Sequence, residues 1–149
     1  MRALLQRVSG ASVEADDQVI GSIDRGLVTL VGVAKGDSPD DAHYLADRIL
    51  HLRIFEDTAG KLNHSLWSTR GACLVVSQFT LLANTRRGRR PDFLAAAVPA
   101  VAAPLVGDVA ARLRAEGISV VEGRFGARMV MRLVNDGPVT IWLDSRERA

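Results

Sequence analysis

The stretch LVTLVGVAKGDSPDDAHYLADRIL, residues 27–50, holds one strand and one helix, and the change of period between them indicates the fold class. Its first part, Leu27 to Val33, is a continuous apolar run of the kind that forms a buried strand. Ser38-Pro39-Asp40-Asp41 then supplies a capping hydroxyl, a proline in the first turn and two acids near the positive end of a helix dipole. Apolar residues follow at helical spacing, namely Ala42, Leu45, Ala46, Ile49 and Leu50. A buried strand followed by an amphipathic helix predicts an α/β fold.

Strand-like segments dominate the chain on both sides of this stretch. Towards the N-terminus, Ala3 to Val8 is a predicted strand, and Ser12 to Ala15 with Gln18 to Ile23 is a predicted hairpin turning at Asp16-Asp17. Short apolar runs predict further strands at Ile54-Phe55, Cys73 to Val76, Ser119 to Glu122, Met129 to Val134 and Val139 to Leu143. The fold is therefore expected to be β-rich.

A second helical region is predicted from Pro91 to Glu116, in two pieces. Pro104 and Gly107 weaken the beginning of the second piece, so we expect a kink or a late start there. The apolar face of that piece consists of Leu105, Val106, Val109 and Leu113. The two main helices must pack on the sheet or beside it, which predicts a single α/β, β-rich domain over residues 1–149.

Composition limits the class of protein. The chain has 149 residues, a net charge of +2 and a hydrophobic share of 48%, which fits one domain with a sizeable core and excludes a generic polycation. We expect no membrane partner, because no apolar run is long enough to span a bilayer, and no signal peptide, because Arg7 and Gly10 interrupt the first apolar residues. The single cysteine, Cys73, lies in an apolar run, which favours a cytoplasmic protein.

Common catalytic signatures are missing from the sequence. There is no Gly-x-Ser-x-Gly elbow, no Walker loop and no Gly-x-Gly-x-x-Gly turn. The three histidines, His43, His51 and His64, have no second ligand at metal spacing and are expected to be surface or packing residues. We therefore expect neither a metal site nor a cofactor.

Three polar segments stand out from the apolar strands. In Ser77-Gln78-Phe79-Thr80 a valine-rich strand ends in polar side chains that can converge on a ligand, although a local turn explains the pattern equally well. Asn135-Asp136-Gly137-Pro138-Val139-Thr140 is ordinary turn chemistry, or else a Gly-Pro bond that exposes two carbonyl groups beside a residue without Cβ. Arg86, Arg87, Arg89 and Arg90 surround Gly88 and form either a phosphate contact or a solvated loop.

Taken together, these segments resemble the D-aminoacyl-tRNA deacylase family. Residues 77–80 are followed by Thr85 to Pro91, by Gly123-Arg124-Phe125-Gly126 and by residues 135–140, and this order and spacing are far more specific than any one motif. Met1-Arg2-Ala3, Gln6-Arg7-Val8 and Leu52 to Asp57 match the same family, so the resemblance covers essentially the whole chain. The sequence departs from the family at Arg128, Asp92, Pro104 and Gly107, none of which lies in the two core motifs.

The resemblance implies a compact β-barrel-like domain with helices packed outside, working as a homodimer with two active sites at the interface. It implies that the Gly137-Pro138 bond is cis and enters the partner's site, and that Arg7 braces this turn. Ser77, Gln78, Phe79 and Thr80 would line the aminoacyl-adenosine pocket, with Phe125 and Met129 near the terminal adenosine. Aminoacylated tRNA, rather than DNA, would be the partner, and D-amino acids and glycine would be removed from it while L-aminoacyl-tRNA is spared.

The bond to be cut is an activated ester, so a metal or a covalent nucleophile is not required. We predict that the backbone N–H groups of Phe79 and Thr80 stabilise the oxyanion, because N–H groups come free where a strand ends. No histidine or lysine near Thr80 in the sequence could activate its hydroxyl, which disfavours a covalent role. The resemblance implies attack by water assisted by the ribose 2′-hydroxyl, with Gln78 positioning the substrate.

Three rival functions remain open from the sequence. A non-catalytic RNA-binding module would use the same arginine loop but release no amino acid. An editing factor of related fold would cut an L ester such as L-seryl-tRNA. An esterase or amidase acting on small molecules would have no use for the arginine cluster.

Overall fold

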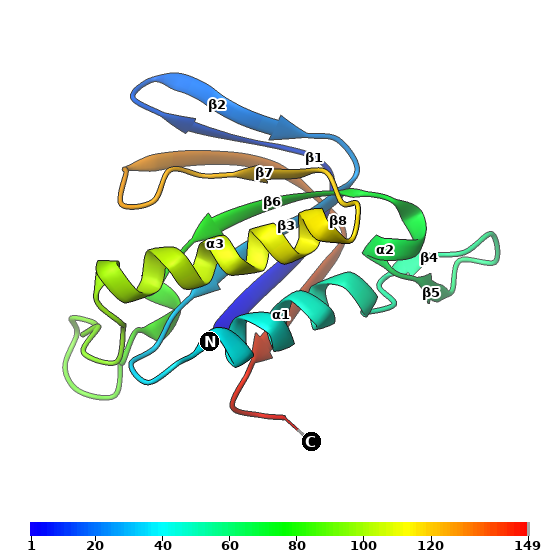
Figure 1. Ribbon diagram of the computed structural model, residues 1–149. Helices are drawn as coiled ribbons and strands as arrows, with labels where there is room; N and C mark the ends of the chain where they lie inside the picture. The colour runs from blue at the N-terminus through cyan, green and yellow to red at the C-terminus, as the bar shows by residue number, and fades with distance from the viewer. Residues whose placement is uncertain (149) are drawn as a thin grey trace.

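The computed structural model describes residues 1–148, and Figure 1 shows two long helices lying across a curled sheet. The elements follow in the order β1 (Arg2–Ala15), β2 (Gln18–Ile23), β3 (Gly26–Gly32), α1 (Pro39–His51), β4 (Phe55–Glu56), β5 (Leu62–His64), α2 (Leu66–Thr69), β6 (Ala72–Ser77), η1 (Phe79–Leu82), α3 (Pro99–Ala115), β7 (Val120–Glu122) and β8 (Met129–Asp144). No helix within residues 1–148 is long and apolar enough to cross a membrane.

The main sheet has the strand order β2-β1-β3-β6-β7, with β8 paired to the other edge of β1. β1 is long enough to pair with β3 through its first half and with β2 through its second half, antiparallel in both cases. The sheet curls until its two ends meet: a Cβ added at Gly21 of β2 would lie 2.2 Å from a methyl group of Val121 in β7. The expectation of a β-rich α/β fold with a barrel-like sheet is confirmed.

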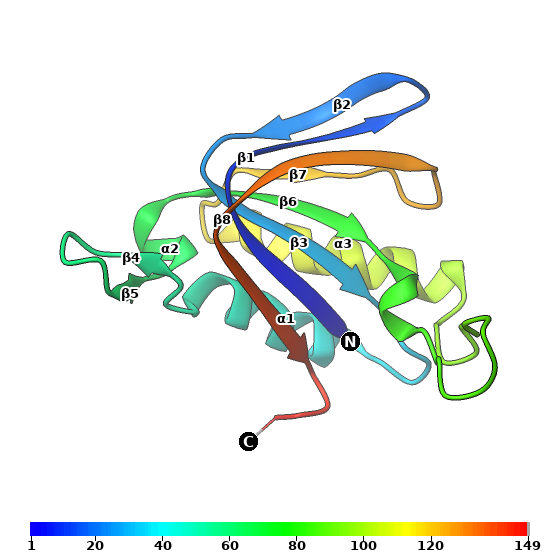
Figure 2. The same ribbon diagram turned by 180° about the vertical axis from the view of Figure 1, so that it is seen from behind.

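Both long helices cover the same side of the sheet, as Figure 1 and the reverse view in Figure 2 show. The expected start of α1 is present: the backbone N–H of Ser38 donates to the Asp41 carboxylate at 2.8 Å, and Pro39 occupies the first turn. The larger core lies between helices and sheet and contains Leu45, Ile49, Val109 and Leu113. A smaller core fills the inside of the curl around Val13, Val28 and Leu74.

In two places, segments predicted as separate strands form one continuous strand. The N-terminal pair forms the continuous strand β1, and the C-terminal pair forms the continuous strand β8. Asn135 pairs with Val8 and Thr140 pairs with Gln6, so residues 136–139 lie opposite Arg7 alone. Gly137 and Pro138 therefore form a bulge inside a long strand, which is where a sheet accommodates a residue without an N–H group.

The prediction of two helical pieces between Pro91 and Glu116 is wrong. α3 is one helix that begins at Pro99, while residues 93–96 form a turn, closed by the Ala96 N–H donating to the Phe93 carbonyl at 3.0 Å, and residues 95–97 pair with residues 33–35 just after β3. Pro104 lies inside the helix on its exposed side, with Gly107 one turn further on. The buried face formed by Leu105, Val106 and Val109 holds the helix straight through these two weak positions.

Candidate functional site

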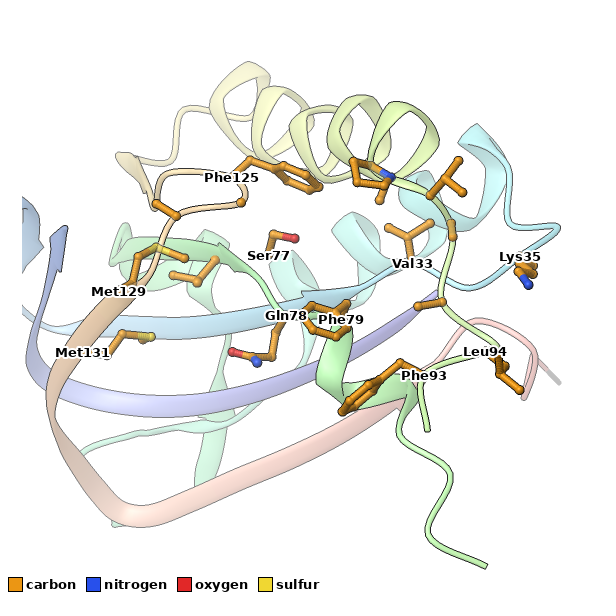
Figure 3. A pocket seen from close by; sticks show the side chains of 18 residues that line it. Val33, Lys35, Ser77, Gln78, Phe79, Phe93, Leu94, Phe125, Met129 and Met131 are labelled. Carbon is orange, nitrogen blue, oxygen red and sulfur yellow. The ribbon is translucent and has the colours of Figure 1, made fainter. Parts of the chain in front are cut away.

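A pocket of about 700 Å³ opens where β6 ends. Figure 3 shows Ser77, Gln78 and Phe79 on one wall, with Phe125 from the turn before β8 and Met129 from the start of β8 on another. The third wall is the segment of residues 93–98 before α3, including Phe93 and Leu94. Three distant parts of the sequence thus meet around one cavity.

The backbone turns sharply at the end of β6, and the turn frees two N–H groups. Gln78 N–H still donates to the Val31 carbonyl at 2.8 Å, as a continuation of the sheet. The chain then enters the 3₁₀ helix η1, in which Leu81 N–H donates to the Gln78 carbonyl at 3.3 Å. The N–H groups of Phe79 and Thr80 donate to no acceptor within residues 1–148, so both can bind an oxygen of a ligand.

Gly32 in β3 permits this turn to sit against the sheet. A Cβ at Gly32 would lie 2.9 Å from the Gln78 carbonyl oxygen and 2.6 Å from a methyl group of Leu82. At the other end of η1, Arg2 donates to the Leu81 carbonyl at 3.0 Å. The turn that carries the free N–H groups is therefore held from both sides.

Aromatic side chains border the pocket and remain open to solvent. Phe79 is 55% exposed and packs edge-to-face on Phe93, with ring centroids 5.0 Å apart. Phe125 is 39% exposed. Phenylalanine is rarely left in water, so these rings are suited to hold a flat apolar group. Sequence reasoning missed Phe93 and Leu94, because that segment was assigned to a helix.

Within residues 1–148, no histidine, lysine or carboxylate forms a hydrogen bond with the Thr80 hydroxyl, the one hydroxyl of this turn. The Thr80 hydroxyl accepts a hydrogen bond from the Gln78 side-chain amide, which is not basic enough to remove the hydroxyl proton. The thiol of Cys73 is no alternative nucleophile, because burial raises its pKa to about 12. No group of three metal-binding side chains occurs in the described part of the chain.

Arg7 organises a second region at the bulge of β8. Its side chain is only 4% exposed and donates to the Ile54 carbonyl at 2.9 Å and the Asp136 carbonyl at 3.3 Å. It also pairs with the carboxylates of Glu56 at 3.2 Å and Asp136 at 3.1 Å. Arg7 thus holds the backbone just before Gly137.

The Gly137-Pro138 peptide bond in this bulge is cis, and Gly137 has a φ of 115°, which favours glycine. The Asn135 side chain spans the bulge by donating to the carbonyls of Arg7 at 3.0 Å and Val139 at 3.1 Å. Both Gly137 and Pro138 are exposed. Gly137 and Pro138 therefore form an exposed bulge whose backbone conformation is fixed by Arg7 and Asn135.

The bulge and the pocket are well separated within one chain. The bulge with Gly137 lies opposite Arg7 in β1, Arg7 pairs with Leu27 in β3, and Leu27 pairs with Cys73 in β6. Ser77 lies four residues further along β6 than Cys73. At about 3.3 Å per residue and about 4.8 Å between strands, three strand spacings place Gly137 roughly 20 Å from Ser77. In Figure 2 the bend of β8 and the end of β6 lie on different parts of the sheet, with β1 and β3 between them.

The arginine cluster lies on the loop that follows η1. Asn84 and Asp92 close this loop through paired backbone hydrogen bonds of 2.9 Å and 3.1 Å. Within residues 1–148, none of its four arginines forms an ion pair, and all are exposed: Arg86, Arg87, Arg89 and Arg90. Because Phe93 follows directly, the loop stands beside the pocket.

Known proteins match this chain along almost its entire length. The family model described as D-Tyr-tRNA(Tyr) deacylase matches residues 4–144. The D-aminoacyl-tRNA deacylase of Thermomicrobium roseum is 58% identical, over 99% of this chain and 96% of that protein. The protein of the same name from Bacillus pumilus is 52% identical, over 99% of this chain and 100% of that protein.

Solved structures have the same architecture. A protein described as c-Myc DNA unwinding element binding protein is 36% identical, with a TM-score of 0.90 over 97% of this chain and 98% of that one. A probable eukaryotic D-amino acid tRNA deacylase, 20% identical with a TM-score of 0.83, shares the fold. The family model and the relatives that are more than half identical show that this chain belongs to the D-Tyr-tRNA(Tyr) deacylase family.

Proposed function

We propose that the protein is a D-aminoacyl-tRNA deacylase, which hydrolyses the ester between a D-amino acid or glycine and the terminal ribose of tRNA. The observation that carries this proposal is the pair of free N–H groups at Phe79, which lines the aromatic pocket, and at the adjacent Thr80, in a member of this family. The rings of Phe79 and Phe125 offer faces on which the terminal adenine can stack.

The chemistry follows from what the pocket offers. Attack on the ester carbonyl places negative charge on its oxygen, and each backbone N–H aimed at that oxygen lowers the barrier by about 3 kcal/mol. Water is the nucleophile and the adjacent ribose 2′-hydroxyl assists it, because the turn itself holds no base. Gln78 positions the ribose or the ester, and the Thr80 side chain takes no covalent part.

The complete site requires a second copy of the chain. Roughly 20 Å separates Gly137 from Ser77 within one protomer, so the bulge reaches only the pocket of a partner. The outer side of β8 supports such a partner, because Val130, Val134 and Trp142 are 50%, 64% and 45% exposed. The proposed assembly is a homodimer with two equivalent sites.

Chiral selection then arises from the partner's backbone. The carbonyl groups of Gly137 and Pro138 hold the α-amino group of the substrate and thereby fix the directions of the other groups on Cα. A D side chain points towards solvent, whereas an L side chain strikes the Gly137-Pro138 backbone. Glycine has no side chain to clash and is accepted.

The arginine loop contacts phosphates of the tRNA acceptor stem. Four exposed arginines without acidic partners supply charge that is not already neutralised within the chain. Replacing Arg86, Arg87, Arg89 and Arg90 by Ala should weaken tRNA binding and flatten its dependence on salt. Unchanged binding and an unchanged salt slope would leave the loop as a solvated surface.

The activity is tested by incubating the protein with D-tyrosyl-, L-tyrosyl-, glycyl- and L-seryl-tRNA and measuring ester loss. Loss of the D-tyrosyl and glycyl esters alone supports the proposal. Loss of the L-seryl ester identifies an L-editing factor, and tRNA binding without ester loss identifies a binding module. Hydrolysis of amino acid esters that lack tRNA, at equal efficiency, identifies a small-molecule esterase.

Subunit complementation tests the shared site. Ser77→Phe fills the pocket, and Gly137→Ala places a Cβ 2.8 Å from the Val139 backbone nitrogen in the bulge. Each variant alone should be inactive. A random mixture of the two should recover about a quarter of the wild-type sites, because half of the dimers then carry one intact pocket facing one intact bulge. Recovery of no activity, with mixed dimers present by mass, would exclude the shared site.

A further inference from the structure

Lys35 is the only charged residue among those that line the pocket. Figure 3 places it at the end of the pocket away from Met129, beyond Phe79 and beside Leu94. The rest of the lining is apolar or carries uncharged polar groups. A single ammonium group at the mouth of an otherwise uncharged pocket favours a ligand that carries negative charge at one end.

The backbone of Lys35 is fixed in place. Its N–H donates to the Ala95 carbonyl at 2.9 Å, and its carbonyl accepts from Arg146 at 2.9 Å. These bonds tie Lys35 both to the segment that forms the pocket wall and to the C-terminal end of the chain. The Lys35 side chain therefore extends from a fixed backbone position at the rim of the pocket.

Two of the three acids closest to Lys35 in sequence, Asp37 and Asp41, already have partners, whereas Asp40 in the first turn of α1 has no ion pair within residues 1–148. Asp37 pairs with the Met1 ammonium at 2.8 Å and with Arg146 at 3.3 Å, and Asp41 pairs with Arg148 at 2.6 Å. Lys35 itself makes no ion pair within the described chain, and its side chain is exposed. Its charge is available for an external anion.

We propose that Lys35 binds the phosphate on the 5′ side of the terminal adenosine of the tRNA. This inference rests on the proposed function. With the adenosine in the pocket, that phosphate is the first charged group on the chain as it leaves towards the acceptor stem. The arginine loop continues the basic rim in that direction, because it follows η1 and returns to the pocket at Phe93. Lys35 is thus a binding residue that sets how far the 3′ end enters the pocket.

The closest competing anion is the carboxylate of the released amino acid. That group is esterified in the substrate and carries no charge until the reaction is over. A lysine that bound this carboxylate would change inhibition by the product amino acid. Its replacement would not change the effect of a 5′-phosphate on the KM of the substrate. The two assignments therefore give opposite results with small substrates.

The first experiment compares the 3′-D-tyrosyl ester of adenosine with the same ester of adenosine 5′-phosphate. The wild-type protein should show a KM about fivefold lower for the phosphorylated ester, the size expected for one solvent-exposed ion pair, with equal kcat. Lys35→Ala should abolish that difference and leave the KM for the unphosphorylated ester unchanged. Lys61→Ala is the matched control, because Lys61 is the only other lysine and lies between β4 and β5, away from the pocket (Figure 2).

The second experiment needs no catalysis. Binding of uncharged tRNA, measured over a KCl series, should lose about 0.7 from the slope of log affinity against log salt in Lys35→Ala, the contribution of one single-stranded phosphate. If the D-tyrosyl esters are cut but Lys35→Ala keeps the phosphate preference, the assignment of Lys35 is wrong. If no ester is cut and the slope still falls, the phosphate contact stands and the proposed function fails. An equal loss on both esters would reveal a structural role and overturn the inference.

Discussion

The two halves of the proposed site are built in opposite ways. At the end of β6, Phe79 is 55% exposed and two backbone N–H groups have no acceptor within residues 1–148. At the bulge of β8, Arg7 is 4% exposed and its guanidinium is paired with two carbonyls and two carboxylates. The first region leaves these two N–H groups free for a ligand, whereas the Arg7 side chain of the second region is engaged within the chain.

This difference matches what each half has to do. A surface that binds a ligand needs free donors, because donors already paired would have to break their bonds first. A backbone that excludes one enantiomer must resist displacement, because a shift of even 1 Å would admit the wrong side chain. The three predictions below test this division, beginning with the braced half.

Removal of Arg7 should have the largest effect. Arg7→Ala leaves the buried carbonyl of Ile54 without its donor and releases the backbone at Asp136. Glu56 and Asp136 are each 52% exposed and can be solvated again, so we expect a loss of about 2–3 kcal/mol in the free energy of unfolding. Urea denaturation measures this loss, and discrimination between D- and L-tyrosyl-tRNA should weaken in the same variant.

Arg124→Ala is the matched control. Arg124 pairs with Asp16 at 2.6 Å, but both side chains are more than half exposed, so its loss should cost less than about 1 kcal/mol. If Arg7→Ala proves as mild as Arg124→Ala and retains full chiral discrimination, Arg7 does not brace the bulge.

A methyl group at Gly32 should have an intermediate effect, confined to the open half. In Gly32→Ala the new Cβ meets the Gln78 carbonyl oxygen at 2.9 Å and must displace the turn that presents the Phe79 and Thr80 N–H groups. We expect kcat on D-tyrosyl-tRNA to fall about tenfold or more, because an oxyanion donor acts only when correctly placed. Single-turnover kinetics at saturating enzyme isolate this step from binding.

Gly107→Ala provides the comparison for the same substitution elsewhere. A Cβ at Gly107 would meet nothing within 4 Å, and Gly107 lies inside a helix, so alanine should stabilise the protein by up to about 1 kcal/mol. Activity should be unchanged. A Gly32→Ala enzyme with wild-type kcat would show that the position of the turn is not critical.

Acid should have the smallest effect and should act at the start of α1, outside both halves of the site. Partial burial tends to raise the pKa of Asp41, but hydrogen bonds from Ser38 and Ser145 outweigh it and lower the pKa from 3.8 to about 2. Because the folded-state pKa is the lower one, the Asp41 carboxylate stabilises the fold above about pH 4, and this contribution is lost as the pH falls towards 2.

Asp41→Asn tests the pH effect directly. The difference in denaturation midpoint between wild type and Asp41→Asn should be largest near neutral pH and should shrink between pH 4 and pH 2. Burial tends to raise the pKa of Asp144, but Arg146 and Arg2 lower it below its usual value. Asp144 therefore also stabilises the fold less in acid, but this contribution is the same in both proteins and cancels in the difference. A difference that stays constant with pH would remove Asp41 from the acid response.

Local sequence signals predicted the elements that depend on local chemistry. Ser38 and Pro39 begin α1 where capping chemistry requires it, and the apolar run from Leu27 forms the buried strand β3. The prediction was wrong at Pro91 to Val98, where backbone pairing with Val33 and Lys35 holds helix-compatible residues in a turn and a short paired segment. Propensity is weaker than such tertiary hydrogen bonds, so no local pattern reveals them.

The sequence by itself determined the family resemblance, the helix that starts at Ser38, and the polar end of β6, because these depend on residue types at short spacing. Only the tertiary structure decided that β8 is a continuous strand with a bulge opposite Arg7, that Phe93 and Lys35 join the pocket, and that Gly137 lies roughly 20 Å from Ser77. Those features depend on which strands pair and in which register. Pairing is settled by contacts between residues far apart in the chain, which a reading of neighbouring residues does not contain.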